Sequence, residues 1–210
     1  MLTIVIGSFG GLEQKKLKSL LAYSSIGHMG YTLIAFSTGT FEGMQILLCY
    51  LFLYMIAGLF LWSIFLVLKL KSKYTKKQNK DLADLQLLSK PNNILALCFS
   101  TVLFSVAGLP PMVGFLVKIG IFLVSIEASM YLVAIVSILC SVISTFYYIR
   151  IVKTMYFENF KIGKLYYPIK FTISITLVCL FYFLFFLFLN PTLIYLISHK
   201  ILFSLTMSVL

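Results

Sequence analysis

The residue best suited to chemistry in this sequence is Lys118, a lysine that stands alone within an otherwise uncharged apolar run. It ends the segment Gly114–Lys118, shortly after the consecutive prolines Pro110 and Pro111. A charged side chain at membrane depth costs at least about 2.5–3.5 kcal/mol on insertion scales, so it should face a polar interior or a partner. The alternative is a lysine near a helix end that extends its long side chain to the headgroups. We favour the first interpretation and expect Lys118 to carry protons.

A histidine and a second lysine are candidates for the same chemistry. His28 lies in the segment Ile26–Tyr31. Histidine titrates near neutrality and can relay protons when it is hydrated, although a structural histidine hydrogen-bonded between helices fits this segment equally well. Lys18 shares a helical face with Lys15, three residues earlier. Composition leaves open whether Lys18 lies in a hydrated interior or belongs to a basic helix end at the membrane interface.

Patterns typical of water-soluble catalytic sites are absent from the sequence. We find no Ser/His/Asp set, no glycine-rich phosphate loop and no pair of neighbouring carboxylates in a cleft-like context. The cysteines are far apart, each within an apolar run, and form no CxxC or Cys/His pattern, so we expect neither a zinc site nor a disulfide framework. They are Cys49, Cys98, Cys140 and Cys179.

The composition is that of a protein surrounded by lipid. Of the 210 residues, 61% are hydrophobic and only 11% are charged, and the mean hydropathy is +1.04. Such a chain has too little polar surface to cover itself in water. The net charge of +11 arises largely from two short stretches between apolar runs, Lys69–Lys80 and Arg150–Lys164. This distribution is typical of membrane-protein loops near anionic headgroups and argues against a nucleic-acid-binding face.

The apolar runs predict an all-α, polytopic helix bundle with about seven spans. A crossing needs about 20 apolar residues. The runs are Leu2–Leu21, Ser24–Ser37, Met44–Leu68, Asn92–Leu109, Met112–Ile126, Met130–Ile149 and Pro168–Leu189. We expect one transmembrane unit over residues 1–190 and an amphipathic tail over residues 191–210, which could lie on the membrane surface.

The middle of the chain allows two arrangements. The stretch from Asn92 to Ile149 is long enough for three crossings, with breaks near Gly108–Pro111 and Glu127–Ser129. Met112–Ile126 is short, however, and could instead be half of a broken span. With three crossings the two basic stretches face opposite sides of the membrane, whereas with a broken span they share a side.

Two segments resemble a known family. Gln14–Tyr31 resembles the Q-x-x-x-K-R-x-L-A-Y-S-S-I-x-H-x-G-Y stretch of antiporter-like subunits of respiratory complex I. Ser105–Lys118 resembles the S-x-A-G-x-P-P-x-x-G-F-x-x-K stretch of subunit 2 of that complex. Asp81–Leu85 and Tyr147–Lys153 also fit subunit 2. Their order and spacing over residues 1–157 strengthen the resemblance.

The resemblance implies a proton-translocating membrane-arm subunit of NADH:ubiquinone oxidoreductase. Family members have fourteen helices in two inverted repeats, and this chain would match helices eight to fourteen, with a broken helix near Pro110-Pro111. Lys18 would correspond to the helix-eight lysine and Lys118 to the helix-twelve lysine. Ser19 departs from the family's usual arginine.

The same resemblance implies partners, cofactors and a location. We expect no cofactor in this chain, since flavin and iron–sulfur clusters would lie elsewhere in the complex. Other membrane-arm subunits, lipids and a separate chain with the missing N-terminal half would be its partners. Arginine-poor, Lys-, Phe- and Tyr-rich usage favours the mitochondrial inner membrane, with a bacterial plasma membrane as the alternative. Rival functions are a sodium/proton antiporter subunit and a structural assembly subunit with inert lysines.

Overall fold

Every secondary-structure element in the described part of the chain is helical. The computed structural model describes residues 1–68, 82–86, 88–90, 92–157 and 171–209. The α-helices and one 3₁₀ turn are α1 (Leu2–Leu12), α2 (Leu17–Ser37), α3 (Phe41–Val67), η1 (Leu82–Leu85), α4 (Asn93–Ala107), α5 (Val113–Glu127), α6 (Tyr131–Tyr156), α7 (Phe171–Leu189) and α8 (Pro191–Val209). The predicted all-α bundle is therefore confirmed at the level of fold class.

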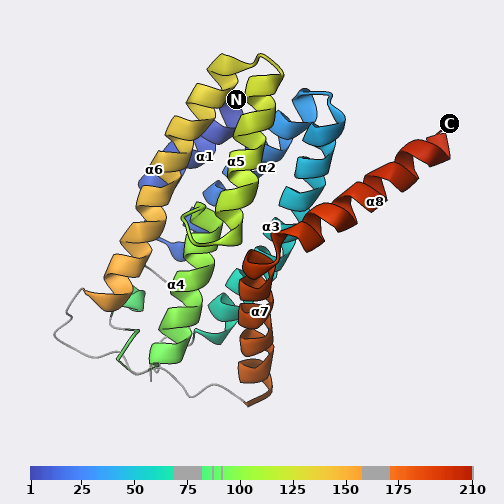
Figure 1. The fold of residues 1–210 in the computed structure, drawn as a ribbon. Coiled ribbons are helices and arrows are strands. Elements are labelled where there is room, and N and C mark those ends of the chain that lie inside the picture. Colours follow the sequence, from blue (N-terminus) through green and yellow to red (C-terminus); the bar gives the residue numbers. More distant parts are fainter. Residues whose placement is uncertain (69–81, 87, 91, 158–170, 210) are drawn as a thin grey trace.

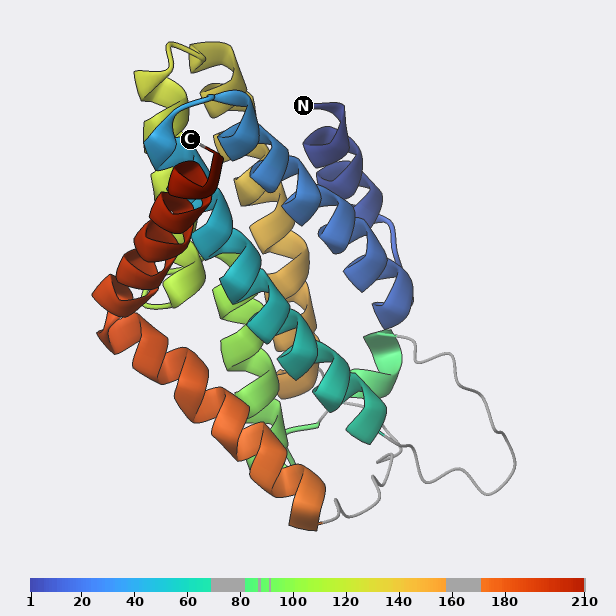
Figure 2. The same cartoon turned by 90° about the vertical axis from the view of Figure 1, so that its right-hand side faces the viewer.

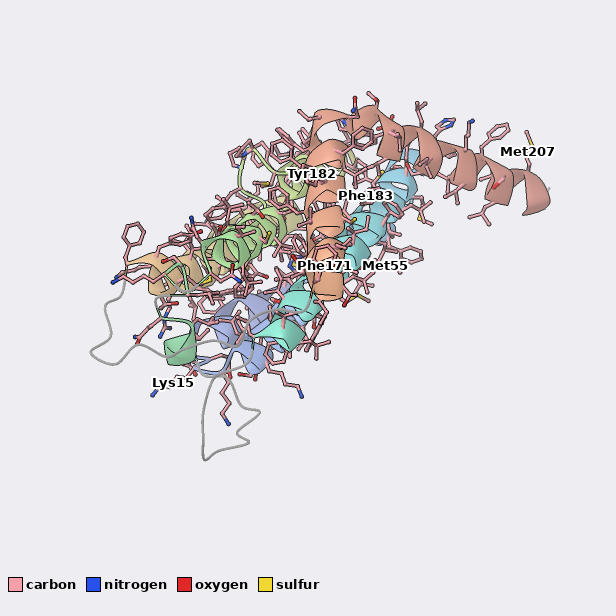
Figure 3. The ribbon with its side chains drawn as sticks, turned by 90° about the horizontal axis from the view of Figure 1, so that it is seen from below. Lys15, Met55, Phe171, Tyr182, Phe183 and Met207 are labelled. Carbon is pink, nitrogen blue, oxygen red and sulfur yellow. The ribbon has the colours of Figure 1, made fainter. Side chains whose placement is uncertain are left out.

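Three of the described helices are long and apolar enough to cross a membrane. They are α3 with 27 residues, α6 with 26 and α7 with 19. Their outward faces carry large apolar side chains such as Met55 on α3 and Phe171 and Phe183 on α7 (Figure 3). The chain is thus a multi-pass membrane protein.

The predicted first run, Leu2–Leu21, is wrong as a single helix. It ends at Leu12, and a second helix starts at Leu17 and continues through the predicted run Ser24–Ser37. Polar residues 13–16 form the turn between them, where Lys15 projects away from the bundle (Figure 3). The two helices then pack side by side (Figure 2).

Glycines let α1 and α2 approach closely. A Cβ added to Gly7 would lie 2.6 Å from the backbone nitrogen of Gly27, so no side chain fits at this contact. Small residues allow this kind of backbone approach between membrane helices. The η1 turn closes the same end, where the Leu82 amide donates to the Lys15 carbonyl at 2.8 Å. Asp81, part of the motif that includes η1, lies outside the described residues.

Helices α4 and α5 are the two halves of one broken helix. In Figures 1 and 2, α5 continues from the upper end of α4, and both halves pack along α6. The α4 helix ends at Gly108, whose φ of +77° is left-handed, and the following prolines cannot continue it. The structure therefore has the broken span and not three separate crossings.

The broken helix bears on whether the two basic stretches lie at the same end of the bundle. All of Lys69–Lys80 and residues 158–164 of the second stretch lie outside the described residues. The first stretch follows the end of α3, the second begins in the last turns of α6, and these two helices end at the same end of the bundle (Figure 1). The two stretches accordingly follow helix ends on one side.

The last helix leaves the bundle at an angle (Figure 1). Its first half is held by α3, because the Gln45 amide donates to the Tyr195 carbonyl at 3.1 Å and Cys49 Sγ lies 3.1 Å from Ser198 Oγ. Further along, Phe203 and Met207 are exposed. The surface-lying tail over residues 191–210 stays a prediction.

The close contact between α4 and α5 gives a test of this fold. A Cβ added to Gly114 would clash with the Ser105 carbonyl oxygen, whereas one added to Gly58 in α3 would meet nothing within 4 Å. We expect Gly114→Ala to lower stability by about 1–3 kcal/mol through overpacking. Gly58→Ala should be neutral or slightly stabilising, because alanine favours helix. Thermal unfolding in lipid nanodiscs compares the two variants, and equal midpoints would contradict the close contact.

Candidate functional site

Lys118 lies in the second turn of α5 with its side chain inside the bundle. Only 4% of its surface is exposed. Its Nζ donates to the carbonyl of Ala107 at 2.7 Å. Ala107 is the last residue of α4, and a carbonyl there has no partner further along its own helix. The helix break therefore supplies the acceptor that this buried ammonium group needs.

Two neighbours shape the space around the ammonium group. The ring centroid of Tyr31, on α2, lies 5.4 Å from Lys118 Nζ, which is within range for a cation–π attraction. A Cβ added to Gly108 would lie only 2.6 Å from Lys118 Cδ, so the absence of a side chain there makes room for the lysine. Within the described residues Lys118 makes no contact with an acidic group.

His28 is held at both ring nitrogens by tyrosine hydroxyls. Nδ1 lies 2.6 Å from the hydroxyl of Tyr50 on α3, and Nε2 lies 3.3 Å from that of Tyr148 on α6. In a neutral imidazole one nitrogen donates and the other accepts. The ring also packs against Tyr54, with 4.9 Å between centroids. His28, 6% exposed, therefore ties α2, α3 and α6 together.

A cavity of about 30 Å³ joins Lys118 to His28. Tyr50, Tyr54 and Ser105 also line it, and its volume suits one water molecule with several polar neighbours. Two ionisable residues that are 90 positions apart thus border the same small cavity inside an apolar bundle. This arrangement places an amine, an imidazole and the Tyr50 hydroxyl bonded to that imidazole around one cavity.

The third predicted residue lies elsewhere. Lys18 is exposed in the first turn of α2. Ten residues separate it from His28 along the helix, or about 15 Å of axial rise. The structure therefore brings His28 and Lys118 together but not Lys18, whose part in proton movement stays a prediction.

The tyrosines around His28 were missed by sequence reasoning. Tyr50 and Tyr54 lie one helical turn apart in an apolar run, and Tyr148 lies in another. Hydroxyl groups at helical spacing within an apolar run are a signal that could have indicated a polar interior. Their common contact with one histidine was not visible, because it joins α2 to helices 22 and 120 residues away.

Metal ligands do not gather in the described part of the chain. It contains no group of three His, Cys, Asp or Glu side chains placed to hold an ion. The described cysteines are free thiols.

Comparison with known proteins gives a consistent picture. A family model described as "NADH:quinone oxidoreductase/Mrp antiporter, TM" matches residues 1–144. The chain is 41% identical to NADH-ubiquinone oxidoreductase chain 2 of Marchantia polymorpha, over 94% of this chain and 39% of that protein. It is 43% identical to NADH-quinone oxidoreductase subunit N of Pelagibacter ubique, over 76% of this chain and 33% of that protein. The chain thus spans about two fifths or less of the length of these relatives.

Solved structures share the fold. A chain of respiratory complex I from Thermus thermophilus with bound aureothin superposes with a TM-score of 0.79 at 28% identity, covering 92% of this chain and 43% of that one. A chain of the Mrp complex from Dietzia sp. gives 0.80 at 17% identity, covering 95% and 45%. The second likeness shows the fold alone.

Gly108 and Gly39 both have a left-handed backbone conformation. Comparing them tests whether the lack of a side chain at Gly108 makes room for Lys118. Alanine costs about 1–2 kcal/mol in such a conformation, so Gly108→Ala and Gly39→Ala should share this loss. Gly39, with φ of +64°, has nothing within 4 Å of an added Cβ. At Gly108 the new methyl group should also displace Lys118 from Ala107, and a hydrogen bond to a charged group contributes about 1.5–3 kcal/mol. Thermal unfolding in nanodiscs should show the larger loss for Gly108→Ala, and equal losses would contradict the crowding.

Proposed function

This chain belongs to the NADH:quinone oxidoreductase/Mrp antiporter family of transmembrane proteins, and from that premise we propose that it translocates protons within NADH:ubiquinone oxidoreductase. In this proposal it is the part of a subunit-2-type, antiporter-like protein of the membrane arm that contains Lys118. The observation that carries the proposal is the buried Lys118 ammonium, which lies at a helix break and lines the same cavity as His28.

The proposed chemistry uses the amine of Lys118 as a proton carrier. The Ala107 carbonyl and the Tyr31 ring, both uncharged, favour the protonated form. The apolar surroundings favour the neutral form, because burial penalises charge. A change of charge nearby can therefore load or expel the proton. Water in the shared cavity then receives it, and the Tyr50 hydroxyl, which lines that cavity and is bonded to Nδ1, passes a proton on to His28.

The described helices are compatible with a membrane-spanning subunit that translocates protons. Three of the described helices, α3, α6 and α7, are long and apolar enough to cross a membrane, and α4 and α5 count together as one broken span. We assign them to the second inverted repeat of an antiporter-like subunit. Lys18, exposed at one end of the bundle, would exchange protons with a neighbouring segment, and the redox chemistry of flavin and iron–sulfur clusters would lie in other subunits.

Partners and location follow from the same proposal. The relatives are more than twice as long as the matched region, so the proposal requires a companion segment with their remaining helices, in the same polypeptide or in a separate one. Other membrane-arm subunits and lipids would cover the apolar faces. Plant relatives of the ubiquinone type at 38–41% identity support the mitochondrial inner membrane.

Substitution of Lys118 tests the proposal directly. Lys118→Ala removes the amine, and Lys118→Arg keeps a charge that cannot be released, because a guanidinium stays protonated in proteins. Both variants should lose proton translocation, by about a hundredfold if the amine is an obligatory proton-transfer group. The measurement is NADH-driven proton uptake by sealed membrane vesicles, normalised to the amount of assembled complex.

The control is Lys153→Ala, which removes an exposed lysine near the end of α6 and should leave uptake unchanged. Full uptake in Lys118→Ala would refute the proton-carrier role and favour a structural subunit. Uptake kept by arginine alone would indicate a fixed charge. Uptake that requires Na⁺ in the medium would favour the sodium/proton antiporter.

A further inference from the structure

One side of the break between α4 and α5 is closed by α7. A small cavity of about 10 Å³ lies between these helices and α3. The α4 helix lines it with Thr101 and Ser105, and α7 lines it with Phe181, Leu184 and Phe185. In Figure 2, α7 runs along the outer edge of the bundle. Within the described part of the chain, α7 therefore forms the outer wall of this space.

The break needs such a wall, because its backbone is not helical. Helix α4 ends at Ala107 and α5 begins at Val113, and non-helical backbone is tolerated at membrane depth only where protein or a water-filled cavity surrounds it. Ser105 also lines the cavity that Lys118 and His28 share. A molecule that reached Ser105 from the α7 side would therefore stand beside the lysine cavity.

Helix α7 is suited to stand between the break and lipid. It contains no charged residue, and its mean hydropathy is 2.5, against 2.2 for α3 and for α6. Only Leu177, Leu184 and Leu187 of this helix are buried, so a narrow seam holds it against the bundle. Tyr182 and Phe183 belong to its exposed side (Figure 3). Such an outer surface is stable against hydrocarbon, because it places no charge there.

Two rings on α7 form the closing contact. Phe181 and Phe185 lie one helical turn apart, and their rings are nearly parallel, with 15° between the planes and 6.4 Å between the centroids. Both line the cavity, yet 45% of the Phe185 surface is exposed. Phe185 therefore has one side on the cavity and another on the outside. Large aromatic rings cover such a boundary with more area than smaller apolar side chains do.

We infer that α7 is a lipid-facing strap, in which Phe181 and Phe185 keep acyl chains out of the helix break and out of contact with the cavity beside Lys118. The excluded guest is hydrocarbon, because the lining of the smaller space is mainly apolar, and apolar cavities stay dry but accept apolar guests. The inference requires α7 to lie in the membrane. It does not require Lys118 to carry protons.

Photo-crosslinking from the lipid tests the strap in the assembled complex, reconstituted in nanodiscs. The probe is a phosphatidylcholine that carries a diazirine in the middle of one acyl chain. On illumination the diazirine loses nitrogen gas and leaves a carbene, which inserts into neighbouring C–H bonds and so needs no reactive side chain. Mass spectrometry of peptides then locates the adducts. In the unmodified protein we expect adducts on Phe183 and none on Thr101 or Ser105.

Removal of both rings should open the strap. We expect Phe181→Ala/Phe185→Ala to raise the adducts on the two α4 residues by about tenfold or more, because burial of one such ring contributes more free energy than that factor requires. The matched control is Phe183→Ala/Phe186→Ala, which removes two rings from the exposed side of the same helix and should leave α4 without adducts. Phe181→Leu/Phe185→Leu keeps an apolar side chain at both positions, so it preserves the packing of α7 better and should give a smaller rise.

Several results would overturn the strap. Adducts on Thr101 or Ser105 in the unmodified protein would mean that α7 does not exclude lipid, and no adducts on Phe183 would mean that α7 faces protein. No rise in the alanine and leucine variants would remove the role of the rings. An equal rise in the control would indicate general loosening of the helix. None of these results bears on proton uptake, so the strap and the Lys118 proposal can fail separately.

Discussion

The free-energy cost of enclosing an ammonium group in an apolar bundle is the constraint on which this structure depends. Lys118 satisfies it without an acidic partner among the described residues, through the Ala107 carbonyl and the Tyr31 ring. That carbonyl is free only because α4 ends there. Gly108 and Gly114 are needed for the same reason, since one leaves room for the lysine stem and the other lets α5 pass the end of α4. The helix break is thus what allows the lysine side chain to be buried.

A second polar junction organises the other helices. His28 draws hydroxyls from α3 and α6 to its two nitrogens, and each of these bonds is strengthened by the low dielectric around it. Hydrogen bonds of this kind hold helices together in a membrane, where apolar packing alone gives little preference between lipid and protein. The junction leaves small cavities beside the ring.

Much of this organisation could be read from the sequence, for identifiable reasons. The isolated Lys118 and the prolines at 110 and 111 are strong local signals, and both were interpreted correctly as burial and a break. The boundary at Leu21 was wrong, because hydropathy averages over the short polar turn at residues 13–16 that reverses the chain. The tyrosine contacts to His28 could not be predicted, since they depend on how distant helices pack. Composition left Lys18 open between a hydrated interior and a basic helix end, and the structure places it exposed in the first turn of α2.

The depth of the break has an electrical consequence. The gap between α4 and α5 lies partway along the bundle (Figure 1), so in the proposed role a proton on Lys118 has crossed only part of the insulating layer. Moving one charge across the whole layer involves about 2.3 kcal/mol for each 100 mV of membrane voltage. A carrier at intermediate depth divides that work between two steps. One step brings the proton from one side of the membrane to the lysine, and the other takes it from the lysine to the opposite side. The membrane voltage would then act on the occupancy of the lysine itself, and the same helix break that accommodates the charge would make the site responsive to the gradient it helps to build.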